Sequence, residues 1–185
     1  MASPSHEDHH YCGGRSPGYW KQCQHFSEWP VTAPSILGCT NGTPSQPSAV
    51  TFGSGASSPG ESFYPTFSSA ATLLPVVAPT TGRTISMWEI LAFPNPVASA
   101  SGTATEIVQL ARHLIAAYFN AMVVSDYPIT PAQVLGMWAH GVGGNYCPIG
   151  PCQHPWGPSE LICYLKRTFD LVGFGPDDYN GITCP

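Results

Sequence analysis

The chain has 185 residues, of which 9% are charged, whereas about 25% is usual for soluble proteins. Its net charge of −5 argues against a nucleic-acid footprint. No apolar run reaches the ~18 residues that a membrane-spanning helix needs. The length suits one domain with a core and an arm. Few charges with 20 Pro and 19 Gly suit a surface covered by neighbouring subunits.

Residues 1–11 are expected to form a mobile N-terminus. They lack the basic and apolar regions of a signal peptide, so we expect either a protein that is cytosolic when made or a mature form without its leader. The histidines at positions 6, 9 and 10 are interpreted as part of a solvated tail rather than as a metal site.

Residues 12–39 are rich in turns and aromatic side chains. Tyr19, Trp20, Phe26 and Trp29 recur at spacings near three and four, which predicts a short helical turn that buries its rings on one side. A stacking platform for sugar is the alternative. We favour an aromatic core, because nothing polar converges on these rings in the sequence.

Residues 40–83 differ in kind, since Glu61 is the only charged side chain between Glu28 and Arg83. Such a Gly/Ser/Pro-rich segment cannot by itself bury enough apolar surface to offset its ordering entropy. We therefore expect an extended arm that lies along another subunit. Deleting residues 45–78 should then leave a folded domain that no longer assembles. The expected partner-binding residues are Phe52, Phe63, Tyr64 and Phe67.

From residue 84 to residue 185 the pattern becomes helical. A short helix over 86–91 is expected to stop before Pro94 and Pro96. Thr103 and Glu106 have the spacing of a capping box, which predicts a helix over 103–122. Its predicted buried face follows i, i+3, i+4 spacing and comprises Ile107, Leu110, Ala111, Leu114, Tyr118, Ala121 and Met122.

Two further helices are predicted after this one. Thr130 and Pro131 suit the cap and first position of a helix that ends at the glycines of residues 141–144. Residues 157–160, Gly-Pro-Ser-Glu, are typical of the start of another. The expected fold class is mainly α with long irregular segments: a small domain of three to four helices, the aromatic unit packed on it, and the arm.

Seven cysteines are many for a chain of this size. We favour disulfides, which suit an extracellular or virion particle. Zinc ligation and free buried thiols are the alternatives. The odd count leaves at least one thiol unpaired within the chain. A bond between Cys147 and Cys152 is expected across their Pro/Gly-rich loop, while the other pairings stay open. The disulfide candidates are Cys12, Cys23, Cys147, Cys152, Cys163 and Cys184.

The zinc alternative rests on a repeated C-x-H pattern. The pattern joins Cys23 to His25 and Cys152 to His154. The repeat is short and lacks the C-x₂-C spacing usual for zinc sites, so these four residues are weak candidates. No metal and no cofactor is expected.

The sequence gives no convincing active site. The P-loop and G-x-G-x-x-G patterns are missing. His113 is interpreted as a half-buried histidine bonded to a nearby carbonyl, and His140 as a cation that complements a helix C-terminus. We therefore expect no catalytic residues and no enzymatic activity.

Two sequence boxes resemble a known group of proteins. The first comprises Gly18, Tyr19, Trp20 and Lys21. The second spans residues 110–120, Leu-Ala-Arg-His-Leu-Ile-Ala-Ala-Tyr-Phe-Asn. Their order resembles that of a group of bacterial surface or secreted proteins with relatives carried by bacteriophages. In that group a histidine usually lies two residues after the lysine, where this chain has Cys23.

The resemblance and the composition together lead to three functional hypotheses. The first is a structural, non-enzymatic component of an extracellular assembly: a bacteriophage virion protein (decoration, minor capsid or tail component) that binds neighbouring subunits, including copies of itself. The second is a secreted bacterial surface or matrix protein that binds carbohydrate or partner proteins. The third is an unrecognised hydrolase. Nucleic acid is not an expected partner.

Overall fold

The computed structural model describes residues 13–36, 39, 58–67, 84–148, 150 and 152–169. This part of the chain is mainly helical, as the sequence predicts, and its β-pairing is limited to isolated bridges. Its helices are α1 (Pro17–Trp20), the 3-10 helix η1 (Cys23–Glu28), α2 (Met87–Ala92), α3 (Pro94–Ser101), α4 (Thr105–Val123), α5 (Pro131–Gly141) and α6 (Pro158–Thr168). None of them is long and apolar enough to cross a membrane.

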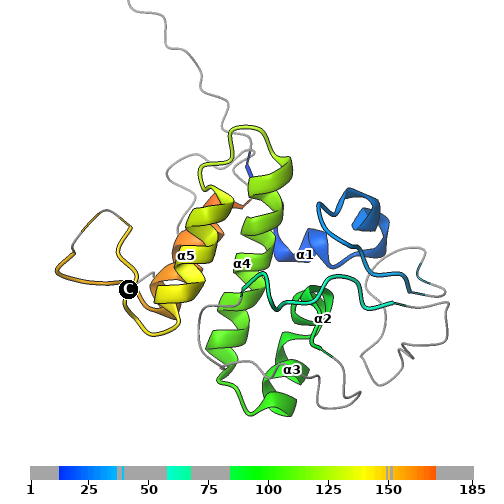
Figure 1. Ribbon diagram of the computed structural model, residues 1–185, viewed down its shortest axis with the longest axis horizontal. Coiled ribbons are helices and arrows are strands. Elements are labelled where there is room, and N and C mark those ends of the chain that lie inside the picture. The colour runs from blue at the N-terminus through cyan, green and yellow to red at the C-terminus, as the bar shows by residue number, and fades with distance from the viewer. Residues whose placement is uncertain are drawn as a thin grey trace, which may run out of the picture.

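Helix α4 is the centre of the fold. In Figure 1 it runs through the middle of the molecule, with α5 and α6 on one side and α1, α2 and α3 on the other. Because helices pack against α4 from both sides, it also buries residues outside the predicted face. Met122, predicted to be inside, is 45% exposed. The fully buried apolar positions are Val108, Leu110, Ala111, Leu114, Ile115, Ala116, Ala117 and Phe119.

The start of α4 differs from the predicted capping box. Its N-cap is Ala104, and no side chain caps it. Glu106 is consequently the second helical residue, so its carboxylate lacks the position from which an N3 side chain reaches back. Instead Glu106 accepts a hydrogen bond from Ser159 at the beginning of α6. The helix itself is confirmed, but its capping box is wrong.

Helix α5 begins as its sequence predicts. Thr130 Oγ1 accepts from the backbone N–H of Gln133, and Gln133 Oε1 accepts from the N–H of Thr130 at 2.8 Å. Pro131 occupies the first helical position, where its missing N–H has no partner to lose. Helix α6 also starts at the expected proline, and Glu160 accepts from the N–H of Gly157 at 3.0 Å.

Helix α3 was not predicted from the sequence. Helix α2 ends at Ala92, as expected from the prolines that follow, yet a new helix starts at once with Pro94 as its first residue. Both Pro94 and Pro96 lie in the first turn, where their missing N–H groups break no helical bond. A proline that ends one helix therefore begins the next.

Residues 58–67 belong to the helical body rather than to an extended arm. Phe63 and Phe67 are 0% and 1% exposed, and their rings stack at 4.5 Å and contact Trp138. The backbone is tied as well, since the N–H of Phe63 donates to Ile85 at 3.0 Å. This overturns the expectation that Phe63 and Phe67 insert into a neighbouring subunit.

The other two expected partner-binding residues fare differently. Tyr64 packs, partly buried, against the same core, and Phe52 lies outside the described residues. The proposed deletion of residues 45–78 would remove two core rings. It would therefore damage the helical domain instead of isolating it.

Candidate functional site

The Gly-Tyr-Trp-Lys box lies in the tight turn formed by α1 and η1. Ser16 caps α1 by accepting from the N–H of Tyr19, and Pro17 takes the first helical position. The turn buries Trp20 completely and leaves Tyr19 partly exposed. This short helical turn with buried rings is as the sequence predicts.

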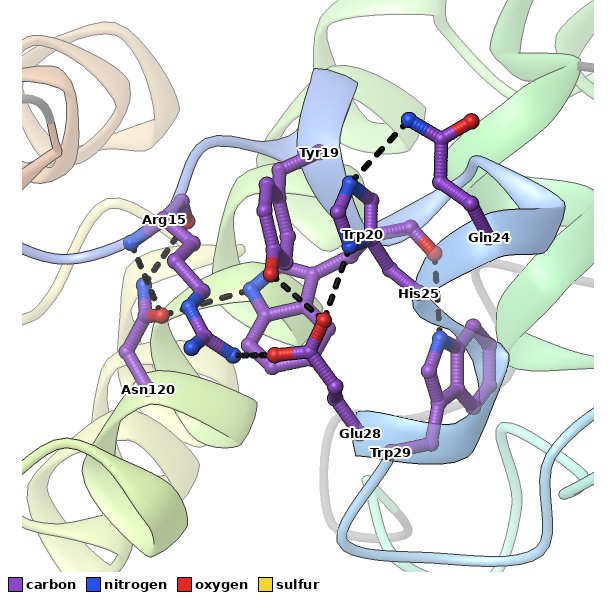
Figure 2. A network of polar contacts seen from close by, with 8 residues as sticks. All are labelled: Arg15, Tyr19, Trp20, Gln24, His25, Glu28, Trp29 and Asn120. Atoms are coloured by element: carbon purple, nitrogen blue, oxygen red, sulfur yellow. Dashed lines mark hydrogen bonds and ion pairs between the residues drawn. The ribbon is translucent and has the colours of Figure 1, made fainter. Parts of the chain in front are cut away.

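Asn120 of α4 clamps the chain that leads into this turn. Its Oδ1 accepts from the N–H of Arg15 at 2.9 Å and from Trp20 Nε1 at 3.3 Å. Its Nδ2 donates to the carbonyl of Arg15 at 2.8 Å (Figure 2). Asn120 is fully buried, and its amide pairs with three groups about a hundred positions away in the sequence. One side chain thus fixes the N-terminal unit on the central helix.

Gly14 makes the clamp sterically possible. A Cβ atom at this position would lie 2.6 Å from Nδ2 of Asn120 and 2.4 Å from the ring of Tyr127. No ordinary side chain fits that gap, so the close approach of the backbone to α4 requires glycine. The N–H of Gly14 also donates to the carbonyl of Thr168, which links the segment to the end of α6.

Glu28 is the centre of a second set of polar contacts. Its Oε1 accepts from Tyr19 OH at 2.7 Å and from His25 Nδ1 at 2.8 Å. Its Oε2 pairs with the guanidinium of Arg15 at 2.5 Å (Figure 2). The hydrogen bonds from Tyr19 and then His25 lower the pKa of Glu28. Burial, followed by the bond to Glu28, raises the pKa of Tyr19 to about 12.

The rings of this cluster are covered by their neighbours. The imidazole of His25 stacks on Tyr19 at 3.5 Å, and the Arg15 guanidinium lies 4.8 Å from the centre of the same ring. Trp29 is buried, and its Nε1 donates to the carbonyl of Trp20. The aromatic core is confirmed at Trp20 and Trp29, and Tyr19 and Phe26 pack against it partly buried.

One part of the sequence argument about these rings is wrong, because polar groups do converge on them. Arg15, Glu28 and Asn120 were missed, and His25 was considered only as a weak zinc candidate. Arg15, His25 and Glu28 share one short segment, but Asn120 lies on a distant helix, and only the fold joins it to them. The one sign of this contact in the sequence was an asparagine within the apolar sequence of α4, since a buried side-chain amide needs hydrogen-bond partners.

The contacts of Glu28 fix the side chains around it in position. Glu28 is an ionised carboxylate that already has three donors, so it stabilises Arg15 and His25 in place rather than accepting a substrate proton. Lys21 contributes its carbonyl, which accepts from Trp88 Nε1 at 3.3 Å. Within the described residues its ammonium has no hydrogen-bond or ion-pair partner.

Disulfides join cysteines in both halves of the structure. Cys147 is bonded to Cys152, as expected, with Cα atoms 5.7 Å apart. Cys23 is bonded to Cys39, which was not among the candidates, with Cα atoms 5.8 Å apart. Cys163 is disulfide-bonded too. The remaining candidates, Cys12 and Cys184, lie outside the described residues.

These bonds overturn the zinc alternative at its four residues. Cys23 and Cys152 have no thiolate to offer, because both sulfurs are oxidised. His25 pairs with Glu28, and His154 is exposed on a loop. Within the described residues no group of three or more His, Cys, Asp or Glu side chains is placed to hold a metal ion.

His113 is bonded to a backbone carbonyl, as predicted, but it is buried rather than half-buried. Its Nδ1 lies 2.7 Å from the carbonyl of Gln109, and its ring lies 6.0 Å from that of Phe169. Burial, followed by the charges of Arg112 and Lys166, lowers the pKa of His113 to about 4. His140 is exposed in the last turn of α5.

The lowered pKa of His113 predicts a pH dependence of stability. Between pH 6.5 and 4 the imidazole of His113 binds a proton in the unfolded chain but stays neutral in the folded chain. The free energy of unfolding therefore decreases as the pH falls through this window. The expected loss is on the order of 2–3 kcal/mol at pH 4. Urea unfolding at pH 7, 5.5 and 4 measures it, and His113→Gln should remove this component. Equal pH dependence in both proteins would contradict the assignment.

No family model, no curated protein and no solved structure matches this chain. The resemblance of its two sequence boxes to bacterial and bacteriophage surface proteins stays an expectation. The role of the Gly-Tyr-Trp-Lys box therefore follows from the contacts between residues 13–36 and α4. In this chain the box joins the N-terminal unit to the helical body.

Proposed function

We propose that this protein is a non-catalytic, disulfide-stabilised component of an extracellular assembly, acting as a secreted surface or matrix protein that binds other molecules. The observation that carries the proposal is the state of its cysteines. All five in the described part of the chain, Cys23, Cys39, Cys147, Cys152 and Cys163, are disulfide-bonded. Disulfides persist outside the cytosol and are rare within it.

We rank the surface-protein hypothesis ahead of the virion one, and the burial of Phe63 and Phe67 supports this order. The virion hypothesis relied on these rings to bind a neighbouring subunit, and both are used by the chain's own core. A virion component remains the second candidate, because disulfides suit a released particle equally well.

The proposed lack of catalysis is supported by how the ionisable side chains are used. Glu28 is saturated with donors, and His113 is held neutral against a backbone carbonyl. A general acid or base needs a group within reach of substrate and a pKa near the working pH. Neither side chain combines these properties.

Localisation in the source organism tests the proposal. Intact cells are labelled with a membrane-impermeant biotin reagent, and the medium, envelope and cytosol are probed with an antibody to residues 84–169. We expect the protein in the medium or among surface-labelled proteins. Recovery only from the cytosol, protected from label, would overturn the proposal. Co-sedimentation with purified phage particles, and absence from phage-free cultures, would favour the virion candidate.

A further inference from the structure

The loop between α5 and α6, residues 142–157, is held by two independent ties. The Cys147–Cys152 disulfide closes its tip. At its base the N–H of Trp156 donates to the carbonyl of Tyr146 at 2.7 Å, and the N–H of Tyr146 donates back at 3.2 Å. In Figure 1 this yellow-to-orange loop projects from the helical body. The base of the loop, at Tyr146 and Trp156, is therefore held in place before any partner binds.

Three aromatic rings gather at the base of the loop. The Trp156 ring lies 5.4 Å from that of Tyr164 on α6 and 6.4 Å from that of Tyr146. The ring planes are tilted by 51° and 47°, so the rings do not cover one another face to face. All three pack against the core and are still partly exposed. Unlike the rings of Trp20 and Trp29, they keep surface for a ligand.

The polar tips of these rings are unused within the described part of the chain. Neither Trp156 Nε1 nor the hydroxyls of Tyr146 and Tyr164 make a hydrogen bond there. Burial raises the pKa of Tyr146, which keeps its phenol protonated as a donor. Partly buried tryptophan and tyrosine usually place these groups against a partner.

The loop offers no charge to a ligand. Residues 142–157 include no Asp, Glu, Lys or Arg, and their polar side chains are amides and one imidazole: Asn145, Gln153 and His154. All three are exposed. On α6 beside Tyr164, Glu160 accepts from the N–H of Gly157, and Arg167 also has a partner within the chain. A neutral polyhydroxyl ligand would therefore find donors and acceptors in the loop without meeting an unpaired charge there.

We propose that Tyr146, Trp156 and Tyr164 form a binding surface for an uncharged polysaccharide. The negative face of an aromatic ring attracts the C–H face of a sugar. The ring N–H and O–H groups, which have no hydrogen-bond partner among the described residues, bind its hydroxyls. Three rings are too small for a stable protein interface, which buries about 800 Å² per partner. The inference rests on the proposed function, since such a ligand is part of a cell surface or matrix.

Binding to defined neutral glycans tests this surface. The intact, oxidised protein is titrated with cellohexaose, laminarihexaose and chitohexaose (N-acetylated), with tryptophan fluorescence and calorimetry as readouts, and is sedimented with insoluble cellulose and chitin. We expect at least one of these probes to bind, and Trp156→Ala to weaken that binding about tenfold or more. Tyr164→Phe keeps the ring and should weaken binding less than Tyr164→Ala.

Two controls separate loss of binding from loss of folding. Phe26→Ala removes a partly exposed ring far from the loop and should leave the affinity unchanged. Each variant is also checked by thermal unfolding, and Tyr164→Phe keeps the test valid if an alanine variant does not fold. The proposal is overturned if none of the probes binds at millimolar concentration, if all loop variants bind like the parent, or if anionic heparin binds in place of the neutral glycans. Such failure would leave the surface localisation of the protein untouched, so the two proposals fail separately.

Discussion

Leu114→Ala is expected to lower the free energy of unfolding by about 2–5 kcal/mol. Leu114 is fully buried in the middle of α4, the helix against which α1, α2, α3, α5 and α6 all pack. Shortening its side chain removes apolar contacts and leaves a cavity that surrounding helices cannot fill without moving. Urea denaturation followed by circular dichroism at 222 nm measures the change.

Met122→Ala is the matched control for this prediction. It shortens a large apolar side chain on the same helix, but the side chain is 45% exposed. Its cost should stay within about 0.5 kcal/mol, as is usual for surface substitutions. A loss well under one kcal/mol for Leu114→Ala, or equal losses for both variants, would show that α4 is not the centre of the core.

Asn120→Ala is expected to destabilise the protein by about 3–5 kcal/mol, since each buried polar group left unpaired costs about 1–3 kcal/mol. The variant removes the partner of three groups: the N–H and the carbonyl of Arg15, and Nε1 of Trp20. The N-terminal unit should loosen first, because its other contacts include the partly exposed cluster at Glu28. Trp20 fluorescence should therefore change at lower urea than the helical signal.

Asn145→Ala is the control for the clamp. Asn145 is exposed, and its Nδ2 makes one local bond to the carbonyl of Gly143. Its loss should cost less than about 1 kcal/mol. If Asn120→Ala were no more harmful than Asn145→Ala, and Trp20 and the helices still unfolded together, then Asn120 would not tie the two regions.

Most of the helices could be predicted from the sequence, because the residues that mark their starts and buried faces lie close together in the chain. A hydroxyl before a proline is enough to place the start of α5, and three- and four-residue spacing is enough to find α4. The starts of α3 and α4 were not predicted correctly. Thr103 lies one residue too early to cap α4, and Pro94 opens a helix although a proline also ends one. Both depend on helix boundaries, which packing decides.

The candidate site was less predictable, because it is made of long-range contacts. Asn120 meets Arg15 across 105 positions, and neither residue belongs to a recognisable motif. The roles of Phe63 and Phe67 were misread for a similar reason. Their surroundings in sequence are polar and Gly/Ser-rich, and composition averages over a segment whose few rings reach the core. Cysteine pairing was only partly readable, since spacing suggested Cys147–Cys152 but gave no sign of Cys39.

The number of free thiols in the native protein tests the central claim most directly. Protein from the source organism is trapped with N-ethylmaleimide before lysis and measured by intact mass, without and with reduction. The oxidised, extracellular protein proposed here should take up one maleimide before reduction. One is expected because Cys23–Cys39 and Cys147–Cys152 are bonded, Cys163 is bonded too, and an odd number of cysteines leaves one over once Cys163 pairs with Cys12 or Cys184. After reduction all seven cysteines should react. Seven maleimides on the unreduced protein would contradict the account.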